Sequence, residues 1–302
     1  MLGEEVDVGE EFLEGFVVPD GARLIGTVFP DWPLNARNVS SVLERTAYFA
    51  IDVEPRRFIG AIFDQSPARG FEAPLIECDK ATVCIGRARS PDLVHPWEMM
   101  TTTTGPIDNG PESIPSSGVS SGRELRVHAV NAPLLFGYEC GEPCRTPRSM
   151  AAVIVVDWNV QVPPANFETP IGVRSTSSPG ENWPRAGSQI VAGSRWRNSL
   201  TVPSGLVPLA PTFSLDTGPT GDIHAVFEVT GDPETVFAAA EVVLAAATGN
   251  AVEPQGPARF DGDRGVWLST NYSEAGGYGL SASLVYDDQR HVGFLRIHGN
   301  ND

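Results

Sequence analysis

The chain has 302 residues, of which 41% are hydrophobic and 8% aromatic, so it can build packed cores and is not globally disordered. Its formal net charge of -17 at pH 7 opposes binding to nucleic acid or to an anionic membrane surface, because both depend on Lys and Arg contacts. No run of roughly 18 apolar residues occurs, so the sequence predicts no transmembrane segment.

Turn-forming residues indicate the fold class. The chain holds 31 glycines and 26 prolines, a content typical of strands joined by many irregular connections rather than of a helical bundle. A length of 302 residues fits two ordinary domains. The only lysine, Lys80, stands against twenty arginines, which is typical of a high-GC bacterial genome.

The first predicted strand with a clear inward face covers residues 47–51. Ala47, Phe49 and Ile51 alternate along it, and alternate residues lie on one face of a strand. A helix is predicted behind this strand, because Pro55 suits the first helical position, where its missing N–H costs nothing. The apolar stripe of that helix consists of Phe58, Ile59 and Ile62.

The flanking segments complete a first unit. Residues 18–25 predict a strand before this pair, and residues 125–131 and 151–158 predict strands after it. We interpret residues 71–122 as an insertion that forms a long surface loop, because it contains a Thr-, Gly-, Pro- and Ser-rich tract. Residues 161–194, rich in Pro, Ser and Gly, predict a linker or an extended strap.

The second half of the sequence echoes the first. In an alignment without gaps, Ala225, Phe227 and Val229 fall on the inward positions of the first strand, and an acid–proline pair follows each strand. Asp232 is expected to cap a second helix that begins at Pro233. The apolar stripe of this helix has the same offsets as the first and consists of Val236, Phe237 and Ala240.

These features predict an α+β protein of two tandem related units, each a mainly antiparallel sheet with one helix packed on a face. The first unit covers residues 1–160. The second covers residues 195–302, and its later strands are predicted at residues 265–271, 281–286 and 292–297. The alternative is chance recurrence of a common strand–proline–helix pattern.

The four cysteines form two close pairs in turn-rich segments, Cys78 with Cys84 and Cys140 with Cys144. An even number of cysteines in loops favours disulfides and an oxidising compartment. Zinc is a rival, but the spacings depart from the usual ones and neither pair has a histidine nearby. Free thiols are another alternative, and the pairing is left open between local and crossed.

The sequence predicts no catalytic residue, no cofactor and no metal site. Residues 118–122 match the G-x-S-x-G pattern of a nucleophile elbow, but a Pro/Ser/Gly tract precedes them and a predicted strand follows, where the elbow needs a strand and then a helix. His128 and His224 alternate away from the apolar faces of their strands, so we expect solvent or a polar partner beside them. A catalytic base assembled from distant residues is the alternative.

Tryptophans in loop-like surroundings are the candidate surface recognition residues. They are Trp97, Trp183 and Trp196. A tryptophan in a loop can serve sugar or peptide recognition through stacking and amphipathic contact. The alternative role is to cover the edge of a small core.

Binding without catalysis is the function that we expect from these features. The paired cysteines favour an extracytoplasmic protein, secreted or anchored at the cell envelope in the manner of a lipoprotein, with a protein or glycan ligand. Residues 1–5 lack the features of a signal peptide, so this expectation requires that the signal is not part of this chain; a cytoplasmic protein is the alternative. A hydrolase with dispersed catalytic residues and a structural assembly subunit are the alternative functions. The oligomeric state is left open.

Overall fold

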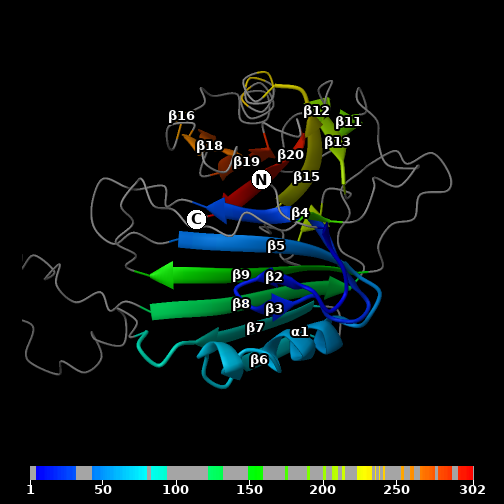
Figure 1. Cartoon of the computed structure of the whole chain (residues 1–302), viewed down its shortest axis with the longest axis vertical. Helices are drawn as coiled ribbons and strands as arrows, with labels where there is room; N and C mark the ends of the chain where they lie inside the picture. The colour runs from blue at the N-terminus through cyan, green and yellow to red at the C-terminus, as the bar shows by residue number, and fades with distance from the viewer. Residues whose placement is uncertain are drawn as a thin grey trace, which may run out of the picture.

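In the computed structural model, the chain forms two large, mostly antiparallel β-sheets that pack against each other (Figure 1). The structure describes the following residues: 5–31, 43–79, 83–93, 122–131, 149–158, 174–175, 189–190, 200–201, 206–209, 213–214, 223–232, 235, 238, 241, 253–254, 259–261, 266–275, 278–287 and 292–301. Within them, no helix is both long and apolar enough to span a membrane.

The first sheet has the strand order β1-β10-β4-β5-β9-β8-β7-β6. Its strands are β1 (Glu5–Val6), β10 (Arg174–Ser175), β4 (Ala22–Asp31), β5 (Leu43–Ile51), β9 (Ser149–Trp158), β8 (Gly122–Asn131), β7 (Val83–Arg89) and β6 (Leu75–Asp79). All neighbouring strands pair antiparallel except β1 and β10. The strands predicted around residues 47–51, 125–131 and 151–158 are confirmed as β5, β8 and β9.

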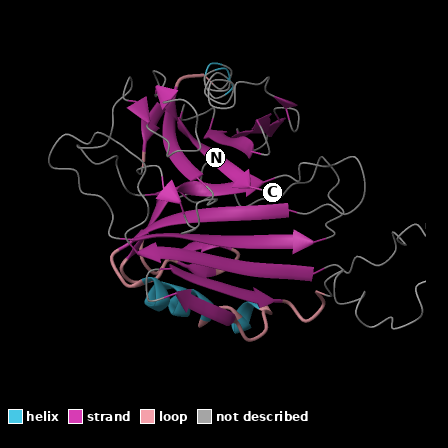
Figure 2. Cartoon of the chain, turned by 180° about the vertical axis from the view of Figure 1, so that it is seen from behind, coloured by secondary structure: helices cyan, strands magenta, loops and turns pink. Residues whose placement is uncertain are grey.

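One face of the first sheet is covered by the helix α1 (Pro55–Phe63) and by the hairpin of β2 (Glu11–Leu13) and β3 (Phe16–Val17). The helix begins at Pro55 as predicted, and all three residues of its predicted stripe are buried. They pack on the inward residues of β5, which are Ala47, Phe49 and Ile51. A short 3-10 helix, η1 (Pro67–Arg69), follows α1, and Figure 2 shows both helices at one end of the first sheet.

Residues 71–122 are not simply a loop, because β6 and β7 lie in the first part of this range. The apolar pattern is weak in β7 because its residues facing α1 are small. Gly86 lies directly under the ring of Phe63, where a Cβ atom would overlap that ring. Two short strands also lie within residues 161–194: β10 pairs with β4, and β11 (Gln189–Ile190) pairs with β12 (Leu200–Thr201).

The second sheet has the strand order β13-β15-β20-β19-β18-β16, with β14 paired to β15 and β17 to β18. Its strands are β13 (Leu206–Pro208), β14 (Phe213–Ser214), β15 (Ile223–Thr230), β16 (Glu253–Pro254), β17 (Arg259–Asp261), β18 (Val266–Ala275), β19 (Tyr278–Asp287) and β20 (Val292–Asn301). After β15, the described residues Thr235, Ala238 and Glu241 are helical. The Thr235 N–H donates to Asp232 Oδ1 at 2.9 Å, so Asp232 caps this segment as predicted.

The main paths of neighbouring strands follow the same order in the two sheets. Apart from β1, β10, β14 and β17, two antiparallel strands of each sheet precede a helical segment, and the second of these strands pairs with the last strand of the set. The path β4-β5-β9-β8-β7-β6 of the first sheet therefore corresponds to the path β13-β15-β20-β19-β18-β16 of the second.

The two sheets meet through the face of the first sheet opposite to α1. Val226, Val285 and Phe294 of the second sheet pack with Tyr48 and Ala50 of β5. Because Val226 faces the first sheet, its neighbours Ala225 and Phe227 face the other side of the second sheet. Gly26 of β4 permits this close approach: it has a φ of +71°, and a Cβ there would be 3.1 Å from Val226 Cγ1.

Candidate functional site

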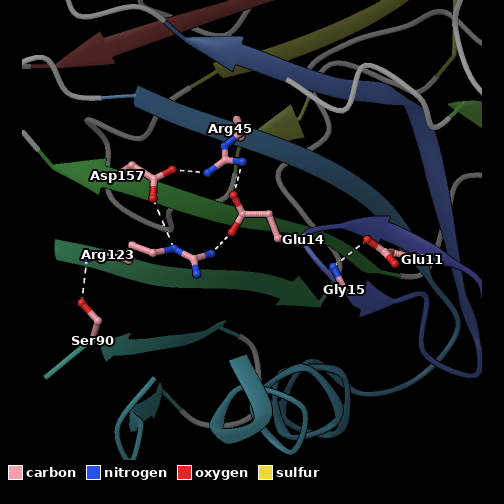
Figure 3. Close-up of polar contacts among 7 residues, drawn as sticks. All are labelled: Glu11, Glu14, Gly15, Arg45, Ser90, Arg123 and Asp157. Atoms are coloured by element: carbon pink, nitrogen blue, oxygen red, sulfur yellow. Dashed lines mark hydrogen bonds and ion pairs between the residues drawn. The ribbon is translucent and has the colours of Figure 1, made fainter. Parts of the chain in front are cut away.

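Four charged side chains from four separate elements meet on the hairpin side of the first sheet (Figure 3). Arg45 of β5 forms ion pairs with Asp157 of β9 and with Glu14, which lies between β2 and β3. Arg123 of β8 pairs with the same two carboxylates, and its Nε lies 3.2 Å from Asp157 Oδ1. The two guanidinium groups and the two carboxylates form a closed ring of zero net formal charge, which we call the charge ring.

Strand register brings three of these residues together. Asp157 lies directly opposite Arg123 in the β8–β9 pair, and Arg45 lies opposite Val155, two residues before Asp157. All three continue the stripes of inward residues that pack under the hairpin: Arg45 precedes Ala47, Arg123 precedes Leu125, and Asp157 follows Val155. The charge ring therefore lies where the apolar core of this face ends.

Glu14 reaches the ring from a tight turn. Glu14 and Gly15 have φ angles of +46° and +82°, so both central residues of the β2–β3 turn have the positive φ of a type I′ turn. Asn, Asp and Gly are the favoured residues there, and the left-handed conformation costs a residue such as glutamate about 1 kcal/mol. The Gly15 N–H donates to Glu11 Oε1 at 2.7 Å. An unfavourable backbone conformation thus occurs where it directs a carboxylate at two guanidinium groups.

The electrostatics of the ring follow from burial. Arg45 is only 6% exposed. Burial lowers the pKa of Arg45 below its usual value, and the charge and hydrogen bond of Asp157 oppose this shift. The guanidinium group still carries its charge at neutral pH, because an arginine pKa starts far above 7.

Arg123 is fixed by contacts beyond the ring. Its guanidinium carbon lies 5.0 Å from the centroid of the Phe71 ring, a distance typical of a cation–π contact. Its backbone N–H donates to Ser90 Oγ at 2.8 Å, and the Ser90 N–H donates to the Arg123 carbonyl at 2.8 Å. The ring thus connects the hairpin, three central strands and the segment after β7.

The chemistry that the charge ring can perform is limited. Guanidinium groups are donors that stay protonated at neutral pH and so do not act as acids or bases, and each carboxylate is engaged by both of them. An arrangement of this kind fixes elements relative to each other. We therefore interpret the ring as a clamp that holds the hairpin on the sheet.

A second polar cluster lies between the two sheets. The Tyr48 hydroxyl is 2.9 Å from His224 Nδ1, and Arg296 Nη1 donates to the same hydroxyl at 3.3 Å. The Arg296 guanidinium also lies 5.5 Å from the centroid of the Phe29 ring. Tyr48, His224 and Arg296 are 0%, 8% and 1% exposed, so this cluster is an internal contact between β5, β15 and β20. His224 has the polar partner that its position in the strand predicts.

Cys78 and Cys84 form a disulfide between β6 and β7, with their Cα atoms 4.1 Å apart. The prediction of a disulfide is confirmed for this pair, and its pairing is local. Cys84 is fully buried against the α1 side of the sheet, whereas Cys78 is exposed. In the part of the chain that the structure describes, no group of three or more His, Cys, Asp or Glu side chains could hold a metal ion.

Other predicted site residues lie outside the described residues. They are Cys140, Cys144, Trp97, Trp183 and Trp196, and residues 118–121 of the G-x-S-x-G match also lie outside the described residues. His128 is described: it lies half-buried on β8, opposite Ile85 of β7. The predictions made for the undescribed residues remain predictions.

The sequence alone does not identify the charge ring. The available signal was a charged residue at an end of each inward-facing apolar stripe, at Arg45, Arg123 and Asp157. Charged residues at strand ends are common, so this signal gains meaning only when register places the three side by side. Glu14 gave no signal of its own. Comparisons of the chain with protein-family models, with curated proteins and with solved structures found no match.

Proposed function

We propose that this protein is an extracytoplasmic binding protein, secreted or held at the cell envelope, that recognises a protein or a glycan without transforming it. The observation that carries the proposal is the Cys78–Cys84 disulfide. Disulfides persist in oxidising compartments, whereas cytosolic reductants keep most thiols reduced. Cys78 is exposed on β6, the last strand of the first sheet among the described residues, so a reductant in the surrounding solution would reach this disulfide.

We also propose that the scaffold is a tandem duplication of one sheet-and-helix unit. The shared strand order of the two sheets supports this. Equivalent residues support it too: Phe49 lies between β4 and β9 and faces away from the other sheet, and Phe227 lies in the same way between β13 and β20. In both units an acid–proline pair follows the strand at the start of the helical segment.

Binding fits the described polar groups better than catalysis does. The charged groups of the ring are engaged with one another, and the hydroxyl of Tyr48 is engaged with His224 and Arg296. Both clusters join elements that are distant in sequence, so they stiffen the scaffold. A rigid scaffold loses little conformational entropy when it binds, which favours recognition.

The experiment that tests this proposal is mass spectrometry of the protein isolated from its host without reductant, after alkylation of free thiols. We expect a peptide pair joined through Cys78 and Cys84, and we expect the protein in the secreted or envelope fraction. Alkylated Cys78 and Cys84 in a cytosolic fraction would overturn the proposed location. The same host material, reduced before alkylation, is the control that shows both cysteines can be labelled.

A further inference from the structure

We propose that β6 is the docking edge for an extended, basic segment of a partner protein, which adds to the first sheet as a further strand. This inference rests on the proposed binding function and names the class of partner. β6 ends the strand order of the first sheet, so within the described residues its outer edge pairs with no other strand. An open strand edge offers a row of backbone donors and acceptors to an incoming strand.

Burial shows that this edge is accessible. All five residues of β6 are exposed, including Leu75 at 66% and Ile76 at 38%. Exposed aliphatic side chains of this size are otherwise rare in the described part of the chain. The helix α1 packs mainly against β7, β8 and β9 rather than against β6. Leu75 and Ile76 face opposite sides of the sheet, so a strand added at this edge would find an apolar contact on each face.

The register identifies the backbone groups that an incoming strand would meet. Cys78 lies opposite Cys84 with a Cα–Cα distance of 4.1 Å, which is typical of the pairs in an antiparallel ladder that are not joined by hydrogen bonds. Ile76 lies two residues away and belongs to the same class of pair. The N–H and C=O groups of Ile76 and Cys78 therefore point away from β7 toward the open edge.

The disulfide prepares this edge for binding. It ties the outermost strand to β7, whose Cys84 is buried in the core beneath α1. A short edge strand would otherwise tend to fray, and the ordering of a frayed strand would lower affinity. The covalent bond thus holds the outward N–H and C=O groups in an extended conformation before any partner arrives.

Charge selects a basic partner. β6 carries the exposed Glu77 and no basic residue, and the whole chain has a net charge of -17. A second copy of the chain is a poorer occupant, because an antiparallel β6–β6 pair centred on Glu77 would place two Glu77 side chains opposite each other. Like charges in that position are destabilising. A strand with arginine or lysine at alternate positions would instead face Glu77 with an opposite charge.

The test mixes the 302-residue chain, with its Cys78–Cys84 disulfide formed, with a fluorescent octapeptide of alternating arginine and valine. Binding is measured by the fluorescence anisotropy of the peptide. We expect saturable binding. We expect affinity to fall by at least about tenfold for the peptide with glutamate in place of arginine, and to be lost for the arginine–valine peptide with every backbone nitrogen methylated. The methylated peptide keeps its charge and side chains but cannot donate backbone hydrogen bonds, so undiminished binding of this peptide would overturn strand addition.

Protein variants locate the site. Ile76→Pro removes an outward N–H, and proline is tolerated on an edge strand, so we expect a loss of about tenfold in peptide affinity with the fold retained. Ile76→Ala is the matched control, since it shortens the same side chain and keeps the N–H. Glu77→Lys is expected to reverse the preference and favour the glutamate–valine peptide. If Ile76→Pro folds and binds as the unchanged protein does, the proposal is wrong.

Two further outcomes decide against the proposal. Sedimentation equilibrium that shows a dimer lost in Ile76→Pro would assign the edge to a second copy. Absence of peptide binding would show that β6 does not bind a basic strand. The proposed binding function would still stand if native material carries the Cys78–Cys84 disulfide in an extracytoplasmic fraction. Free thiols at those positions would overturn the proposed location whatever the peptide does.

Discussion

Replacing Glu14 by asparagine separates two opposing effects at one position. The β2–β3 turn holds Glu14 at a φ of +46°, next to Gly15 at +82°. Asn-Gly is a favoured pair in a type I′ turn, so Glu14→Asn alone should relieve about 0.5–1 kcal/mol of backbone strain. The same change removes the carboxylate that pairs with Arg45 and Arg123. The sign of the change in stability therefore reports which effect is larger.

The size of the loss follows from burial. The side chains of Arg45 and Glu14 are 7% and 20% exposed, so their charged hydrogen bond should contribute about 2 kcal/mol. Arg123 is 34% exposed, which places its pair with Glu14 among the weaker surface pairs, at about 0.5 kcal/mol. Subtracting the relief of strain leaves a net loss of about 1.5–2 kcal/mol in the free energy of unfolding for Glu14→Asn.

Urea denaturation followed by tryptophan fluorescence and circular dichroism measures this loss. With an unchanged dependence on urea, the midpoint of Glu14→Asn should move to a lower concentration. Glu14→Gln is the matched control: it loses the charge but not the strain, so it should be less stable than Glu14→Asn by a few tenths to about 1 kcal/mol. A variant Glu14→Asn more stable than the unchanged protein would show that the charge ring does not hold the hairpin, and would refute the interpretation as a clamp.

Three other changes test the rest of the structure. Tyr48→Phe leaves His224 without its hydroxyl partner in the interface between the sheets, and urea denaturation should show a loss of about 1–3 kcal/mol; no loss would mean that the cluster does not join the sheets. Phe49→Ala and Phe227→Ala should each cost about 3–5 kcal/mol, and clearly unequal costs in calorimetry would count against related units. Reduction of the disulfide between β6 and β7 opens a loop with a sequence separation of 6, which corresponds to about 2 kcal/mol by loop closure; an unchanged midpoint after dithiothreitol would show that this edge gains no stability from it.

The local elements were predictable because their signals are local. The alternation around Phe49 and the stripe after Pro55 predict a strand and a helix from neighbouring residues alone, and β5 and α1 occur there. The strand containing Cys84 was missed. Its inward positions hold Cys84, Gly86 and Ala88, which are small and belong to the core under α1, and Phe63 packs directly on Gly86. Small residues at these positions suit close packing against a helix from another part of the chain. The neighbouring residues therefore show no apolar pattern that predicts the strand.

The candidate site was harder to predict than the fold. A charged residue at the end of an apolar stripe, such as Arg45 or Asp157, has the same appearance in sequence whether it faces water or another charge. Register decides between the two, and register is a relation between strands. The open edge at β6 was also hidden, because five residues in a tract interpreted as a loop give no indication of where a sheet ends.

The amino-acid order by itself determined the acidic charge, the alternating strands, the position of the first helix and the cap at Asp232, since each depends on residues within a few positions of one another. Only the tertiary structure decided that Cys78 pairs with Cys84, that four charges from Glu14 to Asp157 close into a ring, and that the faces of two sheets meet around Tyr48. These contacts join segments separated by up to 248 positions. Their free energy depends on distance in space and on burial, which the order of residues does not contain until the chain has folded.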